Sequence, residues 1–278
     1  MNTISQLREQ AVGLIHKELE YISGFLHYDL EQFFDKDLIY FRSVFAFFKG
    51  PEGASKITGL GISPEQLKAL ISLVVGIELL SVGLRIHAFD IDGLKGIKPC
   101  LENEKIKEKT YTVDLLFGDI FYSRAVIYLL DFGDHKVFDE ILNSLKTVHK
   151  SRLALHHDIL EESAHNFDVT KTLKSRPAFF YGLNELFKTS FLIGLANAIP
   201  EANIHKIGIY YRAVSLLVIL KTYHELSRLF FDLSLNFENS SYFKDAKKKI
   251  QASLEQCLDK IEEPLFENNL RSLSEIFT

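Results

Sequence analysis

The amino-acid sequence predicts an all-α fold, organised as one single-domain helical bundle over residues 1–278. Apolar residues recur at spacings of three and four over long stretches, which is the period of an amphipathic helix. No stretch of the sequence shows the sustained alternation of apolar and polar residues that half-buried strands require. Clusters of glycine, proline and serine separate the helical stretches, and 278 residues suffice for a sizeable core.

Three helices are predicted in the first third of the chain. Residues 5–34 carry apolar residues at spacings of three and four, with one of five, and residues 38–48 form a second apolar segment. The Lys-Gly-Pro sequence at 49–51 ends that segment. The Ser-Pro-Glu sequence at 63–65 is a helix start with a serine N-cap and proline at the first helical position, and it predicts a helix that ends near His87.

A charged loop and the remaining helices follow. Residues 92–108 are charged and contain glycines and Pro99, which predicts a loop. Residues 111–132 form the next helix, and a Gly-Asp sequence at 133–134 ends it. The later helices are predicted over residues 137–167, 175–198, 204–235, 242–261 and 264–276.

Charge and cysteine content narrow the class of protein. A net charge of −5 and a pI near 6.1 argue against nucleic acid as a partner, because no basic face is expected. Cys100 and Cys257 are far apart and outside any C-x-x-C motif, which favours a reduced, cytoplasmic chain. The longest uncharged apolar run, residues 69–77, is about half as long as a membrane span requires. The polar first residues predict no export signal.

Two stretches are candidate functional sites. The first, ELLSVGLRIHAFDID at residues 78–92, is expected to be the end of a buried helix, because it continues a nearly all-apolar segment. Its last turn offers His87, Asp90 and Asp92. The second stretch is LLFGDIFYSRA at residues 115–125, within the next predicted helix.

Together these stretches resemble the trans-polyprenyl diphosphate synthases. That family carries E-L-L-H-x-A-x-L-I-H-D-D-x-x-D on its fourth helix and L-x-G-D-x-L-x-S-R-A on the next helix. The residues that match the first motif are Glu78, Leu79, Leu80, Ile86, His87 and Asp92. Those that match the second are Gly118, Asp119, Ser123, Arg124 and Ala125. The resemblance extends over about residues 38–235 and implies a bundle of the isoprenoid synthase type.

The first motif departs from the family pattern where metal would bind. The resembled family holds magnesium ions against a substrate diphosphate with two aspartate-rich motifs, because Mg²⁺ prefers carboxylate and phosphate oxygens. Here Ala88 and Phe89 stand in place of two adjacent aspartates. Asp90 lies one position out of pattern, so that His87 and Asp92 are the matching residues of a degenerate first motif.

The second aspartate motif is degenerate as well. In the corresponding stretch the one acid is Glu225, preceded by Lys221 and Thr222. The early basic motif of the family has its nearest counterpart in Arg42, and Arg176 stands in place of a lysine. By resemblance, these two arginines are expected to contact a diphosphate.

The resemblance therefore implies a subunit without catalysis of its own, as in the non-catalytic component of heterodimeric long-chain synthases such as heptaprenyl diphosphate synthase component I. A catalytic partner subunit would hold the Mg²⁺, and the pair would make long prenyl chains for quinones in the cytoplasm. No metal or cofactor is expected on this chain alone, and homodimer formation by the chain alone stays open. The helix expected at the interface carries Gly118, Asp119, Phe121, Tyr122, Ser123 and Arg124.

Other interpretations of these residues stay open. His87 also fits a hydrogen-bonded histidine at a helix end, and Asp90 and Asp92 also fit the caps of a turn. A divergent enzyme that is active alone could instead bind a prenyl diphosphate through Arg176 and Asp92.

An unrelated metal-binding bundle is the third possibility. His157, Glu161 and His165 fall on one helical face, and Asp158 and Glu162 are adjacent to them. Imidazole and carboxylate groups are credible ligands for a transition metal, and helical bundles build metal sites in this way. A solvated, charged helix face explains the same pattern more simply.

Overall fold

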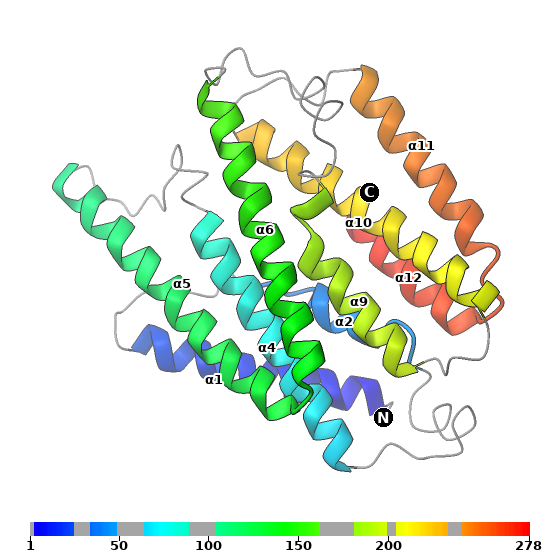
Figure 1. The fold of residues 1–278 in the computed structure, drawn as a ribbon, viewed down its shortest axis with the longest axis horizontal. Helices are drawn as coiled ribbons and strands as arrows, with labels where there is room; N and C mark the ends of the chain where they lie inside the picture. Colours follow the sequence, from blue (N-terminus) through cyan, green and yellow to red (C-terminus); the bar gives the residue numbers. More distant parts are fainter. Residues whose placement is uncertain are drawn as a thin grey trace. The chain divides into compact units, whose positions relative to one another are not determined.

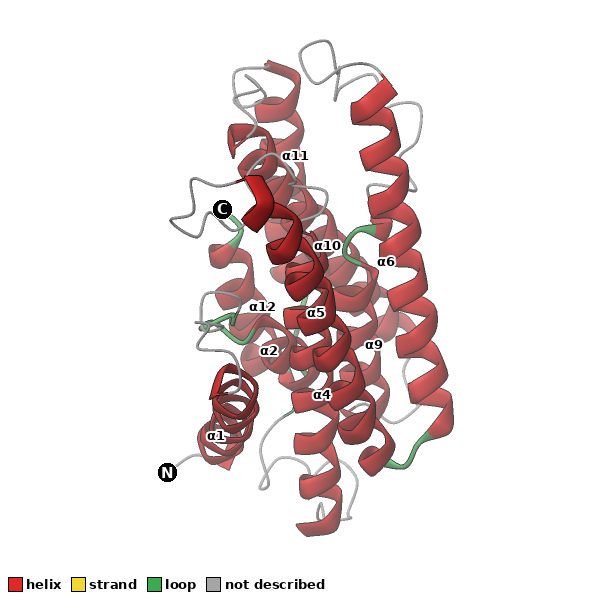
Figure 2. Cartoon of the chain, turned by 90° about the vertical axis from the view of Figure 1, so that its left-hand side faces the viewer, coloured by secondary structure: helices red, strands yellow, loops and turns green. Residues whose placement is uncertain are grey.

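The fold is all-α, as the sequence predicts. The computed structural model describes residues 3–24, 34–48, 64–88, 104–161, 181–198, 204–232 and 241–278. Within these ranges the regular elements are α-helices and there is no strand (Figure 1, Figure 2). The helices are α1 (Thr3–Gly24), α2 (Ile39–Phe45), α4 (Pro64–Ala88), α5 (Glu104–Phe132), α6 (His135–Glu161), α9 (Glu185–Ala198), α10 (Ile204–Asp232), α11 (Ser241–Leu258) and α12 (Pro264–Ile276).

Two compact units make up the chain, and each is described by itself. The first unit comprises Met1–Phe41 and Gly50–Phe138, and the second comprises Arg42–Lys49 and Asp139–Thr278. The single-domain organisation therefore stays a prediction.

Helix α4 is the core of the first unit. Its side chains from Leu70 to Leu84 are all buried, which fits its nearly unbroken apolar sequence. Helix α5 lies beside it, and α1 packs against α4 as well (Figure 1). Among the described residues, Lys68–His87 is long and apolar enough to cross a membrane, yet 83% of that stretch is buried inside the protein.

Close helix contact in the first unit depends on glycines. A Cβ atom at Gly76 would lie 2.8 Å from the Leu129 side chain, and one at Gly83 would lie 2.7 Å from the ring of Tyr122. The two glycines of α4 are seven residues apart, and so are the two side chains of α5 that cover them. This antiparallel heptad spacing lets α4 and α5 approach closely.

Helix α10 is the centre of the second unit, where α9, α11 and α12 pack against it (Figure 1). Aromatic rings fill the space between these helices and the segment at 42–48. The ring centroid of Phe47 lies 5.3 Å from that of Tyr210 and 5.6 Å from that of Phe266, and these rings are in tilted or edge-to-face contact. Edge-to-face contacts also join Phe187 to Phe191 and to Phe277.

Two of the predicted boundaries are wrong. Helix α5 begins at Glu104, inside the predicted loop at 92–108, because residues 104–110 consist mostly of lysine and glutamate, which are good helix formers. The predicted helix at 175–198 is interrupted by a turn at Leu183 and Asn184, and α9 starts only at Glu185.

Candidate functional site

The two family-like motifs meet where α4 ends. The Nε2 atom of His87 lies 3.4 Å from Oδ1 of Asp119, and the ring of His87 lies 5.0 Å from that of Tyr122 between centroids. A Cβ atom at Gly118 would come within 2.3 Å of the same imidazole, so glycine is required for the ring to lie there. His87 is thus a partnered histidine at a helix end, between residues of the second motif.

The remainder of the degenerate first motif extends past the end of α4. Ala88 is the last residue of α4, and Phe89, Asp90 and Asp92 lie outside the described residues. The expectation that Asp92 takes part in a site therefore stays a prediction.

Glu78 opens the first motif and has a structural role. It is 1% exposed, and its Oε1 accepts hydrogen bonds from the backbone N–H groups of Tyr40 at 3.1 Å and Phe41 at 2.9 Å. These N–H groups belong to the first turn of α2, which lacks partners of its own. Burial raises the pKa of Glu78 to about 8, although the two N–H groups and the Arg85 charge favour the ionised form.

An ion pair with Asp35 holds the Arg85 guanidinium near the Glu78 carboxyl. The Nη2 atom of Arg85 lies 2.9 Å from Oδ2 of Asp35, which precedes α2. The ion pair raises the pKa of the Arg85 guanidinium against the opposing effect of burial. Glu78, Arg85 and Asp35 therefore fasten the start of α2 to the middle of α4.

The degenerate second motif forms a polar cluster in the second unit, in which Lys221 is buried and Glu225 is partly exposed. Lys221 is 3% exposed, and its ammonium forms an ion pair with Glu225 one helical turn later. The same ammonium donates to Oδ1 of Asn184 at 2.5 Å. The Asn184 amide in turn donates to Thr222 Oγ1 at 3.0 Å and to Glu225 Oε2 at 2.8 Å.

This cluster lacks the character of a magnesium site. Burial opposes ionisation of Glu225, but the Lys221 ammonium and the Asn184 amide lower the pKa of its carboxyl, so it is a carboxylate. A protein cation already neutralises that carboxylate, and an additional Mg²⁺ would be repelled by the buried ammonium. The turn at Leu183–Asn184 that the sequence did not predict is what aims the Asn184 amide at α10.

Of the two arginines proposed as diphosphate contacts, Arg42 lies within the described residues. Arg42 donates from Nη2 to Oγ of Ser272 on α12 at 3.3 Å, within the second unit. Arg176 lies outside the described residues. Diphosphate binding by either arginine stays a prediction.

Helix α5, the expected interface helix, has one buried face and one exposed face. Phe121 is fully buried, while Asp119 and Ser123 are exposed. Arg124 donates two hydrogen bonds to the carboxylate of Glu18 on α1, at 2.7 and 2.6 Å, and Tyr128 donates a third at 2.9 Å. Although burial opposes ionisation of Glu18, its pKa is lowered by these hydrogen bonds and by the Arg124 charge. Arg124 therefore bonds from α5 to α1 within the first unit.

The exposed face of α5 carries an apolar stripe, which we call the outer stripe. Its large members are Leu116, Ile120, Ile127 and Leu130, which are 57%, 39%, 48% and 52% exposed. With Ser123 between them, these positions are spaced four, three, four and three residues apart, the pattern of a helix–helix seam.

The third possibility, a metal site on α6, is only partly described. His157 is exposed and Glu161 is the last residue of α6, whereas Glu162 and His165 lie outside the described residues. In the part of the chain that the structure describes, no three histidine, cysteine, aspartate or glutamate side chains are grouped so that they could hold a metal ion.

Comparisons with known proteins add no assignment. No protein-family model matches the chain. No curated protein matches it either.

Proposed function

We propose that this protein is the non-catalytic subunit of a heteromeric long-chain trans-polyprenyl diphosphate synthase. The observation that carries the proposal is the contact of His87 with Gly118, Asp119 and Tyr122. Through this contact, a side chain of the first family-like stretch packs against residues of the second. Such a contact is expected if the helical frame of the family is retained.

Loss of catalysis is supported by the second motif. In the resembled family, metal ions neutralise the charge that develops on the leaving diphosphate. Here the one acid of that motif, Glu225, already forms an ion pair with Lys221 and accepts a hydrogen bond from Asn184. We infer that the catalytic partner holds the Mg²⁺ and that this chain stabilises the partner and helps to set the length of a quinone side chain.

The outer stripe of α5 is the surface that would contact the partner. Exposed apolar side chains at alternating spacings of four and three residues fit a partner helix with the same pattern, because such seams interlock side chains from both helices. Four large apolar side chains exposed along one helix face are unusual on a protein that acts alone.

An activity assay tests the proposal directly. With farnesyl diphosphate, isopentenyl diphosphate and Mg²⁺, we expect no long-chain product from this chain alone, because Lys221 already pairs with the one acid of the second motif. We expect product when the subunit with intact aspartate-rich motifs from the same genome is added. Measurement of labelled product by chain length distinguishes the outcomes, and product from this chain alone would refute the proposal.

A charge in the outer stripe should abolish pairing. Ile127→Glu places a carboxylate in the middle of the stripe, and we expect at least about tenfold weaker association with the partner, because burying an unpaired charge is costly. Leu153→Glu on α6 is the matched control, since Leu153 is 69% exposed and lies off the stripe. Both variants should keep the wild-type melting temperature. Equal association of the two variants would exclude the outer stripe as the interface.

A further inference from the structure

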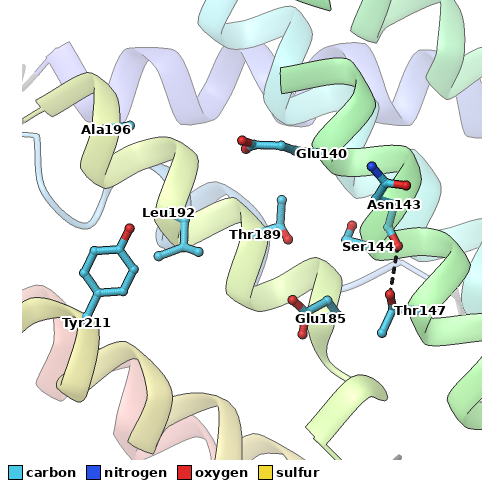
Figure 3. Close-up of a pocket in the computed structure, with 9 residues that line it drawn as sticks. All are labelled: Glu140, Asn143, Ser144, Thr147, Glu185, Thr189, Leu192, Ala196 and Tyr211. Carbon is cyan, nitrogen blue, oxygen red and sulfur yellow. Dashed lines mark hydrogen bonds between the residues drawn. The ribbon is translucent and has the colours of Figure 1, made fainter. Parts of the chain in front are cut away.

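A cavity of about 380 Å³ lies in the second unit between α6 and α9 (Figure 3). Its volume is in the range of small-molecule sites. It is open to solvent, because Glu140, Asn143 and Tyr211 are exposed. The residues that line it are Glu140, Asn143, Ser144 and Thr147 from α6, Glu185, Thr189, Leu192 and Ala196 from α9, and Tyr211 from α10.

The lining is negatively charged. Glu140 and Glu185 approach the cavity from the two facing helices, and none of the lining residues is basic. Lys188 lies nearby, but its Nζ is 2.8 Å from Glu185 Oε1 and neutralises only that carboxylate. Such a surface repels a diphosphate and attracts a cation, so the cavity is unsuited to the substrates of the proposed synthase.

One buried hydroxyl in the cavity has no partner. Thr189 is 8% exposed, and its side chain has no hydrogen bond to any residue that the structure describes. Figure 3 shows this side chain between α9 and α6, within the ring of lining residues. Since buried polar groups normally have a hydrogen-bond partner, this hydroxyl indicates a place for a ligand atom.

Most of the free hydrogen-bonding capacity is for acceptance, although the Asn143 amide and the hydroxyls of Thr189 and Tyr211 can also donate. The hydroxyls of Ser144 and Thr147 already donate, to the carbonyl oxygens of Ile141 at 2.7 Å and of Asn143 at 2.9 Å, so their oxygens can only accept. The two carboxylates likewise can only accept. An ammonium group has three donors and no acceptor, and it therefore complements this set.

The opposite end of the cavity is less polar. Leu192, Ala196 and the ring of Tyr211 lie away from the hydroxyl groups of α6 (Figure 3). The geometry points to a binding site for a small organic cation, a primary ammonium that carries an apolar group. The ammonium would lie at Glu140 and Thr189, since Lys188 already neutralises Glu185, and the apolar group would lie against Leu192 and Tyr211.

Calorimetric titration of the full chain with 2-phenylethylamine, which is cationic at neutral pH, tests this site. We expect saturable one-site binding, and at least tenfold weaker binding of the neutral analogue 2-phenylethanol, because a charge-assisted hydrogen bond would be lost. Glu140→Gln should weaken the amine at least about tenfold. Glu275→Gln, an exposed glutamate on α12, should leave the affinity unchanged.

Thr189→Val provides a second test, because it should change stability and amine affinity in opposite directions. Removal of an unpaired buried hydroxyl should raise the melting temperature by roughly 2–4 °C, while it weakens the amine severalfold. Absence of amine binding, equal binding of amine and alcohol, or full affinity in both Glu140→Gln and Thr189→Val would overturn the assignment. None of these results depends on synthase activity, so the site and the proposed function can fail separately.

Discussion

Gly194→Ala is expected to destabilise the protein by about 2–3 kcal/mol. Replacing glycine by alanine inside a helix normally increases the free energy of unfolding by about 0.5–1 kcal/mol. At Gly194, however, a Cβ atom would lie 2.1 Å from the carbonyl oxygen of Val44 and 2.8 Å from its carbonyl carbon. These are backbone atoms of α2, so no rotamer change can relieve the clash, and α2 itself must shift.

The cost is large because the same contact fixes other groups of the second unit. The hydroxyls of Ser43 and Ser190 share a hydrogen bond beside the glycine, and the rings of Phe47 and Phe191 are in edge-to-face contact at 6.3 Å between centroids. A displaced α2 would disturb both of these contacts.

Gly208→Ala on α10 is the matched control. No atom lies within 4 Å of a Cβ built at Gly208, so only helix propensity acts there and a gain of about 0.5–1 kcal/mol is expected. Urea denaturation of the two variants should move the midpoint in opposite directions. If Gly194→Ala matches Gly208→Ala in stability, the close contact with Val44 is wrong.

Because of Glu78, the free energy of unfolding is expected to fall as the pH rises from about 5 to 8. An unfolded glutamate loses its proton near pH 4.5, whereas the folded protein retains the proton of Glu78 up to about pH 8. Between these values the folded state binds more protons than the unfolded state, so the free energy of unfolding falls with rising pH. The contribution of this group is on the order of 3–5 kcal/mol, complete below pH 4.5 and lost as the pH passes 8.

Glu78→Gln isolates this contribution. The amide is neutral at every pH and its oxygen can still accept from the N–H groups of Tyr40 and Phe41. We expect the variant to match the wild type near pH 5 and to exceed its stability near pH 8. Glu78→Ala removes the acceptor and leaves both N–H groups buried without it, so it should lose about 3 kcal/mol throughout.

The measurement is the free energy of unfolding in urea at several pH values. Two other acids do not interfere, because Glu18 and Glu225 have lowered pKa values and their stabilisation is lost only as the pH falls below about 4.5. An unchanged difference between wild type and Glu78→Gln from pH 5 to 8 would contradict the raised pKa.

Much of the fold follows from apolar periodicity and helix signals. The start of α4 at Pro64 and both ends of α12 agree with their predicted positions, because proline at the first helical position is a local signal. The turn before α9 was missed for the opposite reason. It depends on the Asn184 side chain bonding to Thr222 and Glu225, which are far away in the sequence.

The candidate site was less predictable than the fold. Lys221 and Glu225 are four residues apart in an apolar helix, and this spacing was a readable signal for an internal ion pair. The polar cavity between α6 and α9 has no comparable signal, because its residues come from three helices and only their packing brings them together.

The glycines between α4 and α5 also set a rule for evolutionary change. Each contact pairs a residue without a side chain with a large one: Gly76 with Leu129, Gly83 with Tyr122, and Gly118 with His87. A lineage that gains volume on one helix must lose it on the other, so that the two positions of each pair should vary in opposite directions. This reciprocal signature can identify divergent homologues of the chain whose other residues have changed.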